Sequence, residues 1–180
     1  MGLVVLERSL EPPIDLDDVR AMGDQAAWCM QQYRVQHVTT LLSLDGRKLT
    51  CAFVAPDAEA MRSVLRQLGL AYVRLWPATI HAPVDHPPSA RLAAPDAALV
   101  VVERRFAAAV QPTALPEIED RGASCLAAHR VRFLRAYLSL DRRHMICTYA
   151  APDAESVRNA QHQAGMPFEH AWSALVYETR

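Results

Sequence analysis

Apolar residues along the chain follow two different periods, and the two alternate in a fixed order. Leu3–Leu10 is a short run rich in Val and Leu, which predicts a strand. Leu16–Tyr33 carries apolar residues three and four positions apart, which predicts a helix. Val35–Leu44 and Lys48–Ala55 alternate between apolar and polar positions, which is typical of strands. Asp45-Gly46 between them predicts a hairpin turn, because glycine accepts a positive φ.

Short signals mark the last two elements of this pattern. Asp57 is placed to cap a helix that includes Arg62–Leu68, and Gly69 is placed to end that helix. Tyr72–His81 has the composition of a closing strand. The order strand, helix, strand, strand, helix, strand is that of the ferredoxin-like fold, an antiparallel sheet with both helices on one face.

The whole pattern occurs twice. Residues 3–84 and 99–180 share 26 identities in 82 pairs, without a gap and at an offset of 96 positions. The second copy has its first helix at Ala114–His129, its second at Arg158–Ala164, and its last strand at Phe168–Glu178. We therefore expect a ferredoxin-like repeat at 1–84, a Pro-rich linker at 85–97, and a second repeat at 98–180.

The fold class that follows is α+β, with two ferredoxin-like βαββαβ repeats. The sheet face without helices needs a cover, and the second copy is the obvious one. We expect a pseudo-dimer with the two antiparallel sheets face to face, and a cavity between them. The alternative is that each copy pairs with a second chain.

Alternation along the strands sorts side chains between the two faces of each sheet. It places Thr40, Leu42 and Cys51 toward the helices. The open face, opposite the helices, is expected to carry residues that differ between the copies: His37/Phe133, Thr39/Arg135 and Leu41/Tyr137. Such divergence suits an asymmetric ligand on a symmetric scaffold.

The candidate ligand-binding residues share this open face and have polar or aromatic side chains. Arg135 would pair with an anionic group, Tyr137 would donate a hydrogen bond, and the tryptophans would form walls. The set is Glu7, His37, Trp76, Glu103, Arg135, Tyr137, His170 and Trp172. His37 and His170 are also the candidate metal ligands.

Two pairs of residues each allow two interpretations. The pairs are Glu7-Arg8 and Glu103-Arg104. In the first interpretation the arginine is solvated and the glutamate is an ion-pair partner. In the second, the glutamate is a buried base or ligand with a raised pKa.

The four cysteines lack the CxxC spacing of a metal site. We expect them to be free core thiols, the alternative being a disulfide or a reactive thiol.

The composition of the chain argues against some classes of function. The chain of 180 residues has 19 Lys and Arg against 20 Asp and Glu, which argues against a nucleic-acid binder. Hydrophobic residues make up 51%, enough for a core, and no apolar run is long enough to span a membrane. The first residues do not form a secretory signal, so the expected localisation is cytoplasmic.

Several segments of the second copy carry a resemblance to a known family. They are Tyr137–Asp141, Cys147–Arg158 and Gly165–Pro167, with the opening Val101–Arg104. The chain resembles a family of small bacterial ferredoxin-like proteins, long catalogued as a domain of unknown function, whose described member is a nickel-binding homodimer. The resemblance implies a two-sheet dimer, here fused in one chain. Where family members often have a histidine, this chain has Thr39 and Arg135, which are poor nickel ligands.

The function that we expect is binding of a small ligand or a divalent metal, of the nickel type, between the two sheets. The first alternative is a cofactor-independent enzyme, such as an isomerase or monooxygenase, with Glu103 or His170 as base. The second is a structural or regulatory protein with Trp76 and Trp172 at an interface. The partner would be a small molecule or metal ion, with the chain a monomeric pseudo-dimer or a homodimer.

Overall fold

A computed structural model gives the fold and describes residues 1–92, 97–111, 113 and 115–179. Contacts divide the chain into two compact units. Unit 1 is Met1–Ala78 with the segment from Leu175 onward, and unit 2 is Thr79–Ala174. The described residues form eight strands and four helices in the order βαββαβ twice, so the α+β class with two ferredoxin-like repeats is confirmed.

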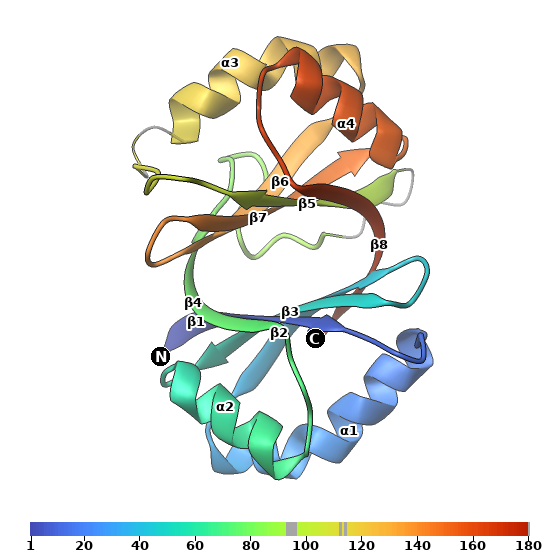
Figure 1. The fold of residues 1–180 in the computed structure, drawn as a ribbon, viewed down its shortest axis with the longest axis vertical. Coiled ribbons are helices and arrows are strands. Elements are labelled where there is room, and N and C mark those ends of the chain that lie inside the picture. The colour runs from blue at the N-terminus through green and yellow to red at the C-terminus, as the bar shows by residue number, and fades with distance from the viewer. Residues whose placement is uncertain (93–96, 112, 114, 180) are drawn as a thin grey trace. The chain divides into compact units, whose positions relative to one another are not determined.

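In unit 1, α1 and α2 lie on the same face of the sheet (Figure 1). The strand order is β4-β1-β3-β2, and each of these pairs is antiparallel. The elements are β1 (Gly2–Ser9), α1 (Leu16–Gln32), β2 (Gln36–Ser43), β3 (Lys48–Ala55), α2 (Ala58–Gln67) and β4 (Arg74–His81).

Unit 2 repeats this arrangement, with α3 and α4 on one face of its sheet (Figure 1). The strand order is β8-β5-β7-β6, again antiparallel. The elements are β5 (Ala98–Arg105), α3 (Leu115–Ala128), β6 (Arg132–Ser139), β7 (His144–Ala151), α4 (Ala154–Gln163) and β8 (His170–Glu178), of which the residues from Leu175 onward belong to unit 1. The expected start of α3 at Ala114, and residues 93–96 of the expected linker, lie outside the described residues.

The sequence signals for the ends of elements act as predicted. Asp57 and Asp153 accept hydrogen bonds from Ala60 N–H and Ser156 N–H at the starts of α2 and α4. Gly46 in the hairpin has φ +69°, and Gly69 after α2 has φ +63°. The helices α2 and α4 begin directly after these aspartates, at Ala58 and Ala154, so each extends four residues before the expected Arg62–Leu68 and Arg158–Ala164.

The core of each unit lies between its helices and its sheet. In unit 1 this core includes Leu6, Leu42 and Cys51 from the strands, with Cys29 from α1 and Leu65 from α2. The four cysteines are free, as predicted, and Cys125 is the one that is only partly buried.

Candidate functional site

On the sheet face opposite the helices, each copy joins a tryptophan to a glutamate. Leu6 belongs to the helix-side core, so alternation places Glu7 on the opposite face. The Trp76 indole N–H donates to Glu7 Oε1 over 2.7 Å, and Trp172 donates to Glu103 Oε1 over the same distance. The predicted face of these four side chains is therefore confirmed.

The contacts of Glu7 favour its interpretation as an ion-pair partner. Besides the indole, Arg74 Nη1 lies 3.6 Å from Glu7 Oε2, and the glutamate side chain is 12% exposed. At the position equivalent to Arg74, unit 2 has His170, which is exposed at the start of β8. A ligand-binding function for this face stays a prediction.

Arg135 and Tyr137 lie on the same face of the unit 2 sheet and are buried. Their neighbour Ala136 belongs to the helix-side core, so alternation turns both of them the other way. The Arg135 guanidinium donates to the carbonyl of Ala90 in the segment before β5. Leu92 of that segment is 1% exposed, so part of the expected linker packs into unit 2.

The expected place of His37 on the open face is wrong. Its imidazole lies on the helix side, in contact with Phe53 of the core and with Thr40. The cause is a β-bulge in β2 between His37 and Thr39, because one extra residue reverses the alternation before it. The same bulge in β6 places Phe133 against the helix-side core of unit 2.

Unit 1 has a large pocket between its sheet and α1 and α2. Its volume is about 720 Å³, within the usual range for small-molecule sites. The walls are mostly apolar, with Met22 and Met30 from α1, Met61 from α2, and Leu6 and Phe53 from the strands. Pockets of this size and composition typically bind an apolar molecule and orient it with a few polar groups.

The polar groups that line this pocket include Arg8, His37, Thr40 and Cys51. The His37 ring nitrogens lie 2.8 Å from Thr40 Oγ1 and 3.1 Å from Thr179 Oγ1. Burial lowers the pKa of His37 to about 4 and raises the pKa of Cys51 to about 11. Both groups are therefore neutral at physiological pH, and the positive charge inside the pocket comes from Arg8.

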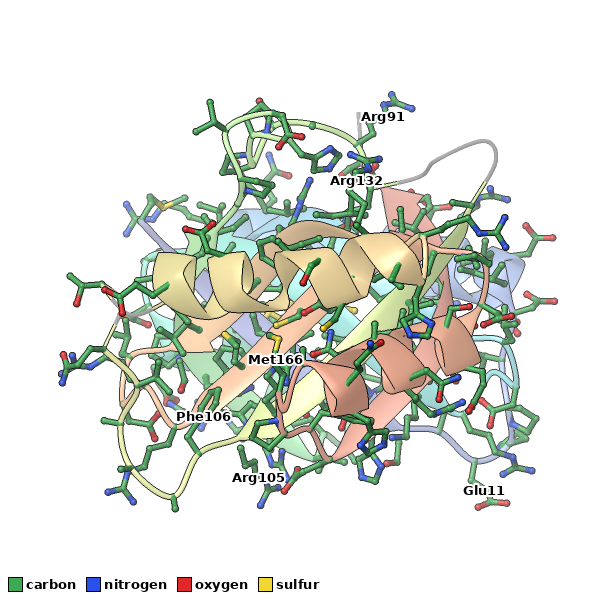
Figure 2. The ribbon with its side chains drawn as sticks, turned by 90° about the horizontal axis from the view of Figure 1, so that it is seen from above. Glu11, Arg91, Arg105, Phe106, Arg132 and Met166 are labelled. Atoms are coloured by element: carbon green, nitrogen blue, oxygen red, sulfur yellow. The ribbon has the colours of Figure 1, made fainter. Side chains whose placement is uncertain are left out.

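In unit 2, the described residues between the sheet and the helices line two smaller pockets, with volumes of about 260 and about 20 Å³. The Arg104 guanidinium, 2% exposed, donates to Tyr149 Oη, Gln161 Oε1 and the carbonyl of Pro167. Met166 lies between α3 and α4 (Figure 2), where a Cβ on Gly122 of α3 would lie 2.8 Å from its sulfur.

Arg8 and Arg104 are site residues that the sequence analysis missed. The solvated interpretation is wrong for Arg104, because alternation with Val100 and Val102 turns its side chain into the core. The signal was present in the repeat itself. At the offset of 96, Tyr149 and Gln161 correspond to apolar residues in the first copy, so the partners of the two arginines differ.

A resident metal ion needs several donor side chains close together. Among the described residues, no group of three His, Cys, Asp or Glu side chains is close enough to hold a metal. The two ring nitrogens of His37 are engaged by threonine hydroxyls, as described above.

Among the helices that the structure describes, none is both long enough and apolar enough to cross a membrane.

Comparisons with known proteins agree with the duplication. The family model described as "Nickel responsive protein SCO4226-like" matches residues 5–77 and again 101–173. No curated protein matches the sequence.

Two solved structures share the fold of the whole chain. One is a putative chlorite dismutase, with 10% identity, a TM-score of 0.52, and coverage of 98% of this chain and 94% of that one. The other is a mutant chlorite dismutase from Candidatus Nitrospira defluvii, solved in complex with cyanide. It has 14% identity, a TM-score of 0.53, and coverage of 98% and 90%.

Proposed function

The chain belongs to the SCO4226-like family of nickel-responsive proteins, and from that premise we propose that it binds a small apolar molecule in the unit 1 pocket. The family description supports small-ligand or metal binding as the general class. The absence of a three-donor group among the described residues favours an organic ligand over a resident nickel ion. The cavity between the sheets, which the sequence suggested, stays a separate prediction.

The observation that carries the proposal is the difference between the two copies. The scaffold and the arginine are the same, but about 720 Å³ is open in unit 1, whereas the pockets described in unit 2 are about 260 and about 20 Å³. In the described part of unit 2, the equivalent positions hold Tyr149 and Gln161, which bond to Arg104, and the sulfur of Met166 lies close to Gly122 of α3. We attribute the larger pocket of unit 1 to these side-chain differences.

An open apolar pocket has a physical consequence. Water in contact with the methionines and leucines of the wall is less favourable than an apolar molecule in the same place, by about 25 cal/mol for each Å² removed from water. A ligand that fills the pocket also restores packing contacts between α1, α2 and the sheet. We therefore expect ligand binding to stabilise unit 1.

The test is titration with Nile red, a neutral dye whose emission shifts to the blue in apolar surroundings, followed by displacement with decanol. We expect one saturable site per chain. Ala26→Leu fills the pocket from α1, where Ala26 is buried in the wall, and should weaken binding at least about tenfold by steric exclusion. The matched control is Ala21→Leu, at an exposed position of the same helix, which should bind as the parent does. Unsaturable binding, or equal affinity in both variants, would contradict the proposal.

A further inference from the structure

We infer that the ligand of the unit 1 pocket is a carboxylate with an apolar body, and that Arg8 binds its carboxylate group. This inference rests on the proposed function and specifies the ligand class for the same site. It follows from comparing the two arginines, group by group.

One edge of the Arg8 guanidinium is fixed by the protein. Its Nε–H donates to the carbonyl of Ala71 over 2.8 Å. Its Nη1 has only a weak contact with the Met22 sulfur, at 3.9 Å. Among the described residues, no carboxylate of unit 1 forms an ion pair with Arg8. The terminal nitrogens therefore face the pocket that the side chain helps to line.

Unit 2 shows which groups bind the terminal nitrogens of the equivalent guanidinium. The carbonyl of Pro167, at the position equivalent to Ala71, accepts a hydrogen bond from Arg104, here from Nη1 instead of Nε. The Nη2 of Arg104 then donates to two oxygens, Tyr149 Oη and Gln161 Oε1. In unit 1 the equivalent residues are Phe53 and Leu65, which have no acceptor, although both line the pocket. The pocket thus lacks two oxygens next to a half-buried positive charge.

A carboxylate supplies two oxygens in one plane, the geometry that a guanidinium binds best with its terminal nitrogens. The rest of the wall favours a single negative charge. Asp24 and Arg34 also line the pocket, but both are exposed and their charges offset each other; Met1, which is also in the lining, is exposed as well. His37 and Cys51 are neutral, so Arg8 is left to compensate one carboxylate.

The experiment is calorimetric titration of the full chain with decanoate and with decanol, which share the apolar body and differ in the head group. We expect decanoate to bind about 10- to 100-fold more tightly, the range for a charge-assisted hydrogen bond. Arg8→Gln should reduce the affinity for decanoate to that for decanol and leave decanol unchanged.

A second variant keeps Arg8 and tests the comparison between the copies directly. Phe53→Tyr/Leu65→Gln introduces the two acceptors of unit 2, so the protein itself should occupy the guanidinium and the affinity for decanoate should fall at least about tenfold. The control is Gln163→Leu on the exposed face of α4, which should change neither affinity.

Two results would overturn the inference in distinguishable ways. If decanoate and decanol bind the parent equally, or if Arg8→Gln weakens both alike, Arg8 does not bind the head group and the proposed pocket still stands. If neither molecule binds, the proposed function fails and the inference fails with it.

Discussion

Arg104 donates to Gln161 Oε1 between the sheet and α4, and both side chains are buried, at 2% and 0% exposure. The glutamine is one of three oxygen partners that enclose this charge. A buried guanidinium is stable only while its hydrogen bonds are made, because removing one partner leaves a desolvated charge.

The first prediction follows from that bond. Gln161→Leu, which introduces the unit 1 residue at this position, should lower the free energy of unfolding by about 3 kcal/mol, because Arg104 then keeps its burial and loses an acceptor. Urea unfolding monitored by circular dichroism measures the change. Gln163→Leu, two residues along the same helix, is the control: it removes only an exposed contact of 3.0 Å with His129 Nε2 and should change stability by less than about 0.5 kcal/mol. Equal effects of the two substitutions would show that the Arg104 network contributes nothing.

The second prediction concerns pH. Burial holds the pKa of His37 at about 4 in the folded chain, below the value of about 6.5 for an unfolded histidine. Between these values the unfolded chain binds a proton that the folded chain does not, so the contribution of His37 to stability is complete above about pH 6.5 and falls as the pH approaches 4.

This decrease in the free energy of unfolding should be about 2 kcal/mol. It is smaller than the full pKa shift of His37 implies, because part of the ring remains in water. The measurement is the urea concentration at the midpoint of unfolding, compared between about pH 7.5 and about pH 4.5. His37→Phe, the residue at the equivalent position 133, removes the titrating group and should show a smaller decrease than the parent. The same decrease in both proteins would mean that His37 is not the group responsible.

The third prediction separates backbone strain from steric contact. Gly46 and Gly69 both have positive φ, but a Cβ on Gly46 would collide with the backbone of Ile14, whereas a Cβ on Gly69 meets nothing within 4 Å. We expect Gly69→Ala to cost about 1 kcal/mol from strain alone, and Gly46→Ala to cost about 3 kcal/mol or more. Thermal unfolding of the two variants measures the difference. If their melting temperatures agree, the close approach of the hairpin to Ile14 is not a constraint.

Local signals explain why so much of the fold could be predicted. The caps at Asp57 and Asp153 and the turn at Gly46 act over a few residues, so the sequence nearby is sufficient to identify them. Alternation in the first and last strands placed Glu7 and Trp76 on one face, because these strands have no irregularity between the residues concerned.

The site could not be predicted in the same way. The bulge between His37 and Thr39 moved the histidine to the helix side, and neither Gly nor Pro marks it in the sequence. The pocket depends on side-chain volumes that meet only in three dimensions, such as Leu65 in unit 1 and Gln161 with Met166 in unit 2. The repeat did contain the relevant differences, but their meaning required knowing which residues surround each arginine.

If unit 1 and not unit 2 binds the ligand, the methionines of the two units provide the most direct test. Met22, Met30 and Met61 line the unit 1 pocket, whereas Met145 and Met166 line the larger pocket in unit 2. Titrating decanol into protein with labelled methionine methyl groups, observed by NMR, reports on both places in one experiment. We predict saturable shifts at Met22, Met30 and Met61, with Met145 and Met166 unchanged. Shifts confined to Met145 and Met166, or none at saturating decanol, would contradict the account.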